Sequence, residues 1–135
     1  MDLVTTAEAR AHLRLDTVIG SSPDDLWLAV FIPAISEAVA NWLKDSWRLY
    51  VCELDANGDP VIDSAGDQIP VADSNGEFTP KFLVKAAVLL ELGSAFRFRE
   101  GEGTDNVVQS HEGHGYTLNK ASTSLLSGIR KTTLK

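Results

Sequence analysis

The segment "SPDDLWLAVFIPAISEAVANWL", residues 22–43, decides the fold class predicted for this chain. Ser22 is a suitable N-cap, Pro23 fits the first helical position, and two acids follow at the positive end of the helix dipole. Pro33 lies inside the helix and predicts a kink, because it removes a backbone hydrogen bond. Apolar residues recur in adjacent pairs four positions apart: Leu26-Trp27, Val30-Phe31, Ala34-Ile35, Ala38-Val39 and Trp42-Leu43. A face this broad predicts a helix that more than one neighbour must cover.

A shorter helix is expected near the N-terminus. Thr5-Thr6-Ala7-Glu8 is a capping box, in which the side chains of the first and last residues each bond the backbone N–H of the other. This pattern predicts a helix that ends at about Arg14 and buries Ala9 and Leu13.

A third helix is expected in the second half of the chain. Thr79 is its predicted N-cap, Pro80 follows, and residues 82–98 are apolar on nearly all sides. This pattern is typical of a central helix surrounded by others, so we expect Leu90 to lie in the core. Gly93 would allow a neighbouring element to approach closely.

The rest of the chain has a different composition. In residues 48–78, short β-prone runs alternate with Asn-Gly and Ala-Gly dipeptides, which predicts a β-hairpin or meander that projects from the helical body. Residues 101–119 are rich in glycine and polar residues and predict a mobile loop, and residues 120–135 form a C-terminal arm. The predicted fold class is therefore mainly α: a small helical bundle in a single domain, residues 1–135, with the β segment inserted between the second and central helices.

Composition narrows the function classes. A formal net charge of −7 argues against a dedicated DNA-binding protein. Cys52 is the only cysteine, so an internal disulfide is impossible and a buried, inert thiol is expected. The N-terminus lacks the pattern of a signal peptide, and the apolar run at residues 82–96 is too short to span a bilayer. We therefore expect a soluble protein with no membrane partner.

The acidic turns in residues 55–77 raise the alternative of a small calcium- or other metal-binding module. Its candidate ligands are Asp55, Asn57, Asp59, Asp63 and Asp67. The spacing departs from that of a helix-loop-helix calcium site, because the glycine comes two residues early and Gly66 stands where a glutamate ligand belongs. Tight turns are therefore the favoured interpretation of this segment.

A second alternative is a metal-dependent enzyme that uses His111, Glu112 and His114. Zinc-protease chemistry needs histidines four apart on a helix, whereas here they are three apart and Gly113 lies between them. No nucleotide loop or nucleophile motif is present. We therefore predict no catalytic residue, no bound metal and no cofactor, and a protein that is not an enzyme.

Four stretches resemble the head–tail connector (adaptor) proteins of long-tailed bacteriophages and prophages. They are "LVTTAEARAHLRLD" (residues 3–16), "DDLWLAVFIPAISEAVANWL" (24–43), "TPKFLVKAAVLLELGSAFRFREG" (79–101) and "SLLSGIR" (124–130). The resemblance covers about two-thirds of the chain and rests on apolar periodicity with a few fixed polar residues. Residues 48–78 and 101–119 are longer than the corresponding segments of the family.

The resemblance implies a structural virion protein at the head–tail interface, assembled in the host cytoplasm. Its copies would form a ring, of dodecameric symmetry, between the portal protein and a stopper or tail-completion protein. Packaged DNA would pass through the channel without specific binding. Leu125, Leu126, Ile129 and Arg130 are the predicted portal-docking element, since an apolar cluster with clustered cations follows the glycine-rich loop. We expect this arm to gain little by packing on its own domain, because a short helix near Gly128 is marginal in water.

Overall fold

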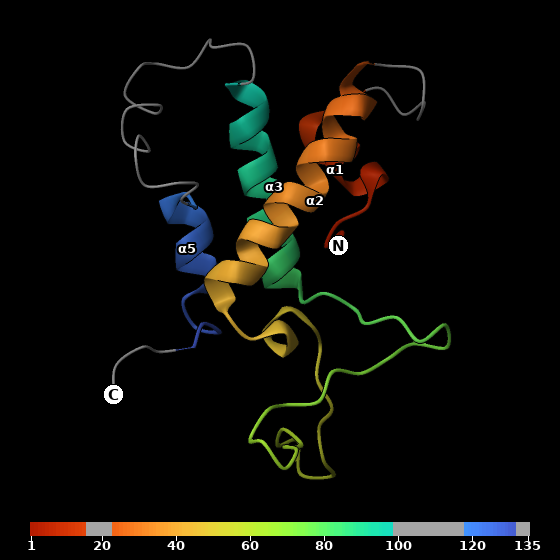
Figure 1. Ribbon diagram of the computed structural model, residues 1–135, viewed down its shortest axis with the longest axis vertical. Coiled ribbons are helices and arrows are strands. Elements are labelled where there is room, and N and C mark those ends of the chain that lie inside the picture. Colours follow the sequence, from red (N-terminus) through yellow and green to blue (C-terminus); the bar gives the residue numbers. More distant parts are fainter. Residues whose placement is uncertain (16–22, 99–117, 132–135) are drawn as a thin grey trace.

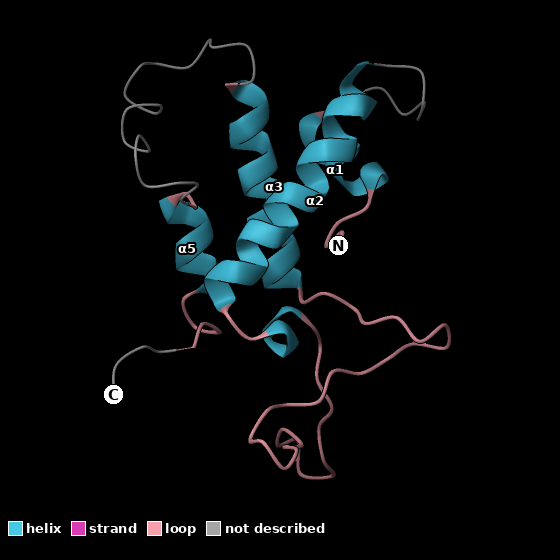
Figure 2. Ribbon diagram, viewed as in Figure 1, coloured by secondary structure: helices cyan, strands magenta, loops and turns pink. Residues whose placement is uncertain are grey.

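The computed structural model describes residues 1–15, 23–98 and 118–131. Within these ranges the chain forms α-helices and one 3-10 helix, and no β-strand (Figure 2). The elements are α1 (Thr6–Leu13), α2 (Pro23–Leu43), η1 (Ser46–Leu49), α3 (Phe82–Arg97) and α5 (Lys120–Leu126). The prediction of a mainly α fold is confirmed.

Helix α3 is the centre of the molecule. It contacts α1, α2 and α5, and α2 crosses it at an angle (Figure 1). Val84, Val88 and Leu92 of α3 are fully buried. The prediction that Leu90 belongs to the core is wrong, because 38% of it is exposed. Gly93 does meet a close neighbour, since a Cβ there would lie 3.3 Å from Nε2 of His12.

The N-terminal helix forms as its capping box predicts. Thr5 Oγ1 accepts a hydrogen bond from the Glu8 N–H at 3.1 Å, and Glu8 Oε2 accepts one from the Thr5 N–H at 2.8 Å. Ala9 is fully buried and Leu13 is partly buried against the core. Lys85 of α3 donates to the second Glu8 oxygen, Oε1, at 2.8 Å, so the same carboxylate caps α1 and fastens it to α3.

Helix α2 continues through Pro33 and contacts α1, α3 and η1, as its broad apolar face predicts. Its covered side carries Leu28, Ile32, Ile35, Val39 and Leu43, all buried. The other side is largely exposed: Leu26 is 76% exposed and Val30 is 61% exposed. The predicted cap Ser22 lies outside the described residues.

Two polar contacts attach the N-terminal residues to α2. Arg10, which is 3% exposed, forms an ion pair with Asp25. The Leu3 N–H donates to the buried hydroxyl of Ser36 at 3.1 Å. Because buried polar groups are costly when unpaired, these contacts specify how α1 lies against α2.

The predicted β-hairpin or meander over residues 48–78 is not formed as strands. Antiparallel pairing is limited to single bridges, Tyr50–Pro80, Cys52–Pro70, Leu54–Pro60, Ile62–Gln68 and Ala72–Phe78. Three of these bridges end on a proline, which has no N–H to extend a ladder, and a turn interrupts every run. The segment nevertheless projects from the helical body, between the end of α2 and the start of α3 (Figure 1).

The prediction that Thr79 caps α3 is also wrong. The helix begins at Phe82, and Lys81 occupies the N-cap position without a side-chain hydrogen bond. The Thr79 carbonyl accepts from the Val51 N–H at 2.9 Å, and the Lys81 N–H donates to the Leu49 carbonyl at 2.9 Å. This pairing keeps residues 79–81 extended, so the helix starts later than the sequence suggests.

Candidate functional site

The projecting segment contains three copies of one turn, at residues 55–59, 63–67 and 73–77. In the first, the Asp55 N–H donates to the Asp59 carbonyl at 2.8 Å and the Gly58 N–H donates to the Asp55 carbonyl at 3.0 Å. Oδ1 of Asp55 accepts from the N–H groups of Asn57 at 2.8 Å and Asp59 at 2.9 Å. The other two turns repeat these bonds. The prediction of tight turns is confirmed.

Glycine is required at the fourth position of each turn. Gly58, Gly66 and Gly76 have φ values of 83°, 87° and 80°, a left-handed conformation that disfavours other residues. Type I turns followed by a left-handed glycine are common in short loops between antiparallel segments. The repeated Asp-x-x-Gly-acid pattern therefore has a local, structural cause.

The turn geometry separates the proposed metal ligands. Asp55, Asn57 and Asp59 belong to one turn and Asp63 and Asp67 to another, and one oxygen of each leading aspartate accepts bonds from its own turn. Among the described residues, no group of three or more His, Cys, Asp or Glu side chains could hold a metal ion.

The other candidates stand as follows. His111, Glu112 and His114 lie outside the described residues, as does nearly all of the loop predicted for residues 101–119. Cys52 is half-buried, and its Sγ lies 3.5 Å from the Trp47 carbonyl oxygen. Burial raises the pKa of this thiol, which keeps it protonated and unreactive at neutral pH.

The projecting segment is an acidic lobe, defined here as residues 50–79. It contains seven acidic residues and no Lys or Arg, so its formal charge is −7. This is the whole formal net charge of the chain, and the remaining residues are therefore neutral overall. None of its residues is fully buried. Five of its large apolar side chains are 41–63% exposed: Val51, Leu54, Ile62, Val71 and Phe78. The lobe is therefore charged, exposed and without a core of its own.

The C-terminal helix packs on its own domain. Leu126 is fully buried, and the buried hydroxyl of Ser122 donates to the Ala87 carbonyl of α3 at 3.3 Å. Just before the helix, the Asn119 N–H donates to Glu91 Oε1 at 2.6 Å, and Glu91 is only 1% exposed. These bonds attach the first half of α5 to the central helix, and the burial of Leu126 holds its last residue.

The residues after α5 are held as firmly. Nε of Arg130 donates to the Trp42 carbonyl at 3.1 Å, and the guanidinium lies 4.2 Å from the centre of the Trp42 ring. The Ile129 carbonyl accepts from Arg48 Nη1 at 2.9 Å. The expectation that this arm gains little by packing on its own domain is therefore wrong, and Leu126 is not available at the surface.

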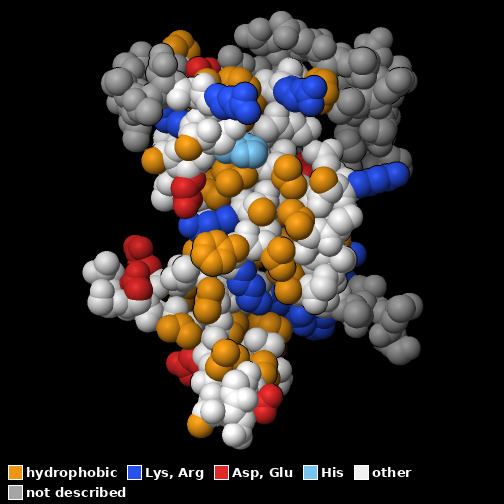
Figure 3. All heavy atoms as spheres, turned by 180° about the vertical axis from the view of Figure 1, so that it is seen from behind, with side chains coloured by type: hydrophobic (Ala, Val, Ile, Leu, Met, Phe, Trp, Pro, Cys, Tyr) orange, Lys and Arg blue, Asp and Glu red, His pale blue; other side chains and the backbone are white. Residues whose placement is uncertain are grey.

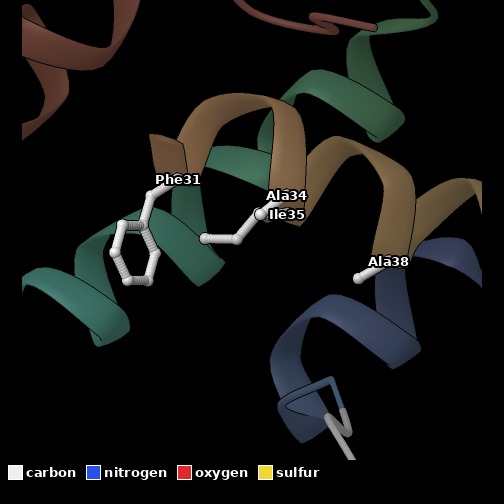
Figure 4. Close-up of a pocket in the computed structure, with 4 residues that line it drawn as sticks. All are labelled: Phe31, Ala34, Ile35 and Ala38. Atoms are coloured by element: carbon white, nitrogen blue, oxygen red, sulfur yellow. The ribbon is translucent and has the colours of Figure 1, made fainter. Parts of the chain in front are cut away.

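Helix α2 carries an open apolar pocket of about 190 Å³. Phe31, Ala34, Ile35 and Ala38 line it at helical spacing, and it opens beside α3 and α5 (Figure 4). Sequence reasoning assigned all four residues to the helical face but did not detect the pocket. The available signal was the pairing of apolar residues, since two adjacent side chains cannot both point at one neighbour.

Helix α3 has an uncovered apolar side of its own. Phe82 is 91% exposed, Leu83 44% and Leu90 38%. Seen from behind, hydrophobic side chains spread over the middle of the molecule among Lys and Arg side chains (Figure 3). A single exposed apolar residue is ordinary, but exposed apolar sides on two crossing helices are candidate contact surfaces.

Helix α2 is the one described helix long and apolar enough to cross a membrane, a test that a core helix of a soluble protein also passes.

Searches of protein-family models, curated proteins and solved structures find no match to this chain.

Proposed function

We propose that this chain is a structural virion protein whose copies form a ring between the portal and a stopper or tail-completion protein. The ring would extend the DNA channel and join head to tail, with no chemistry of its own. The observation that carries the proposal is the pair of uncovered apolar sides, on α2 and α3, of a domain whose core is complete without them. Such sides are stabilised when neighbouring subunits cover them.

The resemblance to connector proteins supports the same function. The stretches that carry it, residues 3–16, 24–43, 79–101 and 124–130, coincide with or overlap α1, α2, α3 and α5. Residues 48–78, which are longer than the corresponding segment of the family, include nearly all of the acidic lobe. The resemblance therefore follows the helical body and not its added segment.

The charge distribution is compatible with a DNA conduit. Proteins that bind DNA tightly neutralise several phosphates with Lys and Arg, whereas this chain is acidic overall and most acidic in its lobe. A channel that must release DNA benefits from weak attraction to phosphates.

The proposal keeps the C-terminal arm as the portal-docking element, but its four residues have different roles: Leu125, Leu126, Ile129 and Arg130. Leu125 and Ile129 are partly exposed and can touch a partner, whereas Leu126 and Arg130 hold the arm in place. The contact would then be a preformed surface, which avoids the entropy cost of ordering a free arm.

The test is capture of the purified protein by the portal encoded in the same phage or prophage, with negative-stain images of the complex. We expect rings stacked on the portal. Leu125→Asp should lower capture, whereas Ser124→Asp, which places the same charge on an exposed neighbour, should not. Absence of portal binding by the wild-type protein would refute the proposed function.

A further inference from the structure

Phe82 is the most exposed large apolar residue of the described chain. It is 91% exposed at the first position of α3, and Leu83 beside it is 44% exposed. Because the first turn of α3 is fixed by the pairing of Lys81 with Leu49, the aromatic ring projects from a rigid base. We call this exposed side chain the knob.

The pocket on α2 has the size of a phenyl ring. Its volume is about 190 Å³, and an enclosed apolar cavity of about 150 Å³ binds benzene. Phe31 and Ile35 supply the larger side chains of its lining, and Ala34 and Ala38 supply the small ones (Figure 4).

The knob cannot enter the pocket of its own chain. Phe31 of the pocket stacks on Trp27 with ring centroids 4.3 Å apart, and Trp27 contacts Phe96 at 5.4 Å, near the end of α3. Phe82 is at the start of α3, roughly 20 Å away along a helix that rises about 1.5 Å per residue. Contact between knob and pocket therefore needs two copies.

Charges beside the two features are complementary. Lys81 immediately precedes the knob, and Glu37, which is exposed, precedes the pocket-lining residue Ala38 in sequence. Neither Lys81 nor Glu37 forms an ion pair with another described residue. Docking of the knob would bring these opposite charges together, which favours one orientation of approach.

We infer that Phe82 of one copy inserts into the α2 pocket of the next copy, with Lys81 facing Glu37. This inference rests on the proposed function, for which it supplies the subunit contact. The contact joins different surfaces of the two copies, so it propagates head to tail and closes into a ring when the rotation allows.

Sedimentation velocity of the full chain, at concentrations up to roughly 1 mM to detect weak contacts, tests the inference. The wild-type protein should form oligomers as concentration rises. Phe82→Asp, which removes the knob and favours a helix start, should be monomeric, as should Ala38→Trp, which fills the pocket. Leu54→Asp, which adds the same charge at a residue 63% exposed on the acidic lobe, should associate like the wild type.

Mixing the two defective variants is the decisive measurement. Ala38→Trp keeps its knob and Phe82→Asp keeps its pocket, so an equimolar mixture should form 1:1 dimers and nothing larger. Circular dichroism melts confirm that each variant is folded. A disulfide between Phe82→Cys of one copy and Ala38→Cys of another, in a Cys52→Ser background, gives an independent readout.

The other outcomes overturn the inference. They are a wild type that stays monomeric and yields no such disulfide, association that the single variants leave unchanged, or a mixture that stays monomeric. If the variants abolish portal capture but not self-association, the pocket serves the portal and the inference is also wrong. Rings that still form with both variants would refute this contact but not the proposed function. Dimers that depend on Phe82, formed by a protein that the portal does not capture, would refute the proposed function but not this contact.

Discussion

Replacing Leu126 with alanine should destabilise the whole domain, although Leu126 closes a helix of only seven residues. The residue is fully buried, and the change removes three carbons worth about 2.4 kcal/mol at ~0.8 kcal/mol per buried CH₂ group. The cavity adds to this cost, because hydrogen bonds from Ser122 and to the Ile129 carbonyl hold α5 on both sides and prevent collapse. The expected total is roughly 3–4 kcal/mol, within the range for buried Leu→Ala changes.

Urea unfolding followed by circular dichroism measures this loss directly, and the melting temperature should fall by about 10 °C or more. Leu125→Ala is the matched control, because Leu125 is only partly buried on the same helix, and it should cost roughly 1 kcal/mol. If Leu126→Ala unfolds at the wild-type urea concentration, α5 does not belong to the core and the arm is free, as its composition first suggested.

Acid should destabilise the wild-type protein more than the Glu8→Gln variant. The hydrogen bond from Lys85 lowers the pKa of Glu8 below 4.5, so its stabilisation is complete above that value and is lost as pH falls through the lowered pKa. The effect is small, because the Glu8 side chain is 37% exposed, and parallel urea midpoints down to about pH 3 would contradict it. Replacing residues 55–76 with a short glycine-containing turn should preserve the helical circular dichroism signal and shift the melting temperature by only a few degrees, because the acidic lobe has no buried residue. Loss of the helical signal would show that the lobe supports the core. Leu92→Ala should lower the free energy of unfolding by roughly 2–5 kcal/mol and Leu90→Ala by about 1 kcal/mol, because Leu92 is fully buried and Leu90 is 38% exposed. Equal urea midpoints for the two variants would show that both sides of α3 are covered.

Sequence reasoning was most successful where structure depends on near neighbours. The capping box at Thr5–Glu8 needs only four consecutive residues, and the structure contains both of its hydrogen bonds. The three acidic turns likewise need only an aspartate, a glycine and the amides between them. The same reasoning predicted strands around these turns and failed, because it gave too little weight to Pro60, Pro70 and Pro80, which interrupt pairing.

The candidate surfaces were much harder to predict. The apolar pairs of α2 indicate a helix with a broad apolar face, but they do not indicate which apolar residues are covered. Leu28, which lies outside these pairs, is fully buried, whereas Leu26, a member of the first pair, is 76% exposed. The difference depends on where α1 and α3 lie, and their sequences are far away along the chain.

The sequence by itself determined the helices, the turns and the concentration of acid in the projecting lobe, because backbone hydrogen bonds, capping and glycine conformation act over a few residues. Only the tertiary structure decided that Leu126 completes the core, that Leu90 does not, and that Phe82 and the α2 pocket face outward at separate places. Burial is a property of the surroundings, since a side chain is removed from water only when segments distant in sequence cover it. Packing between helices therefore fixes which apolar residues remain for a partner.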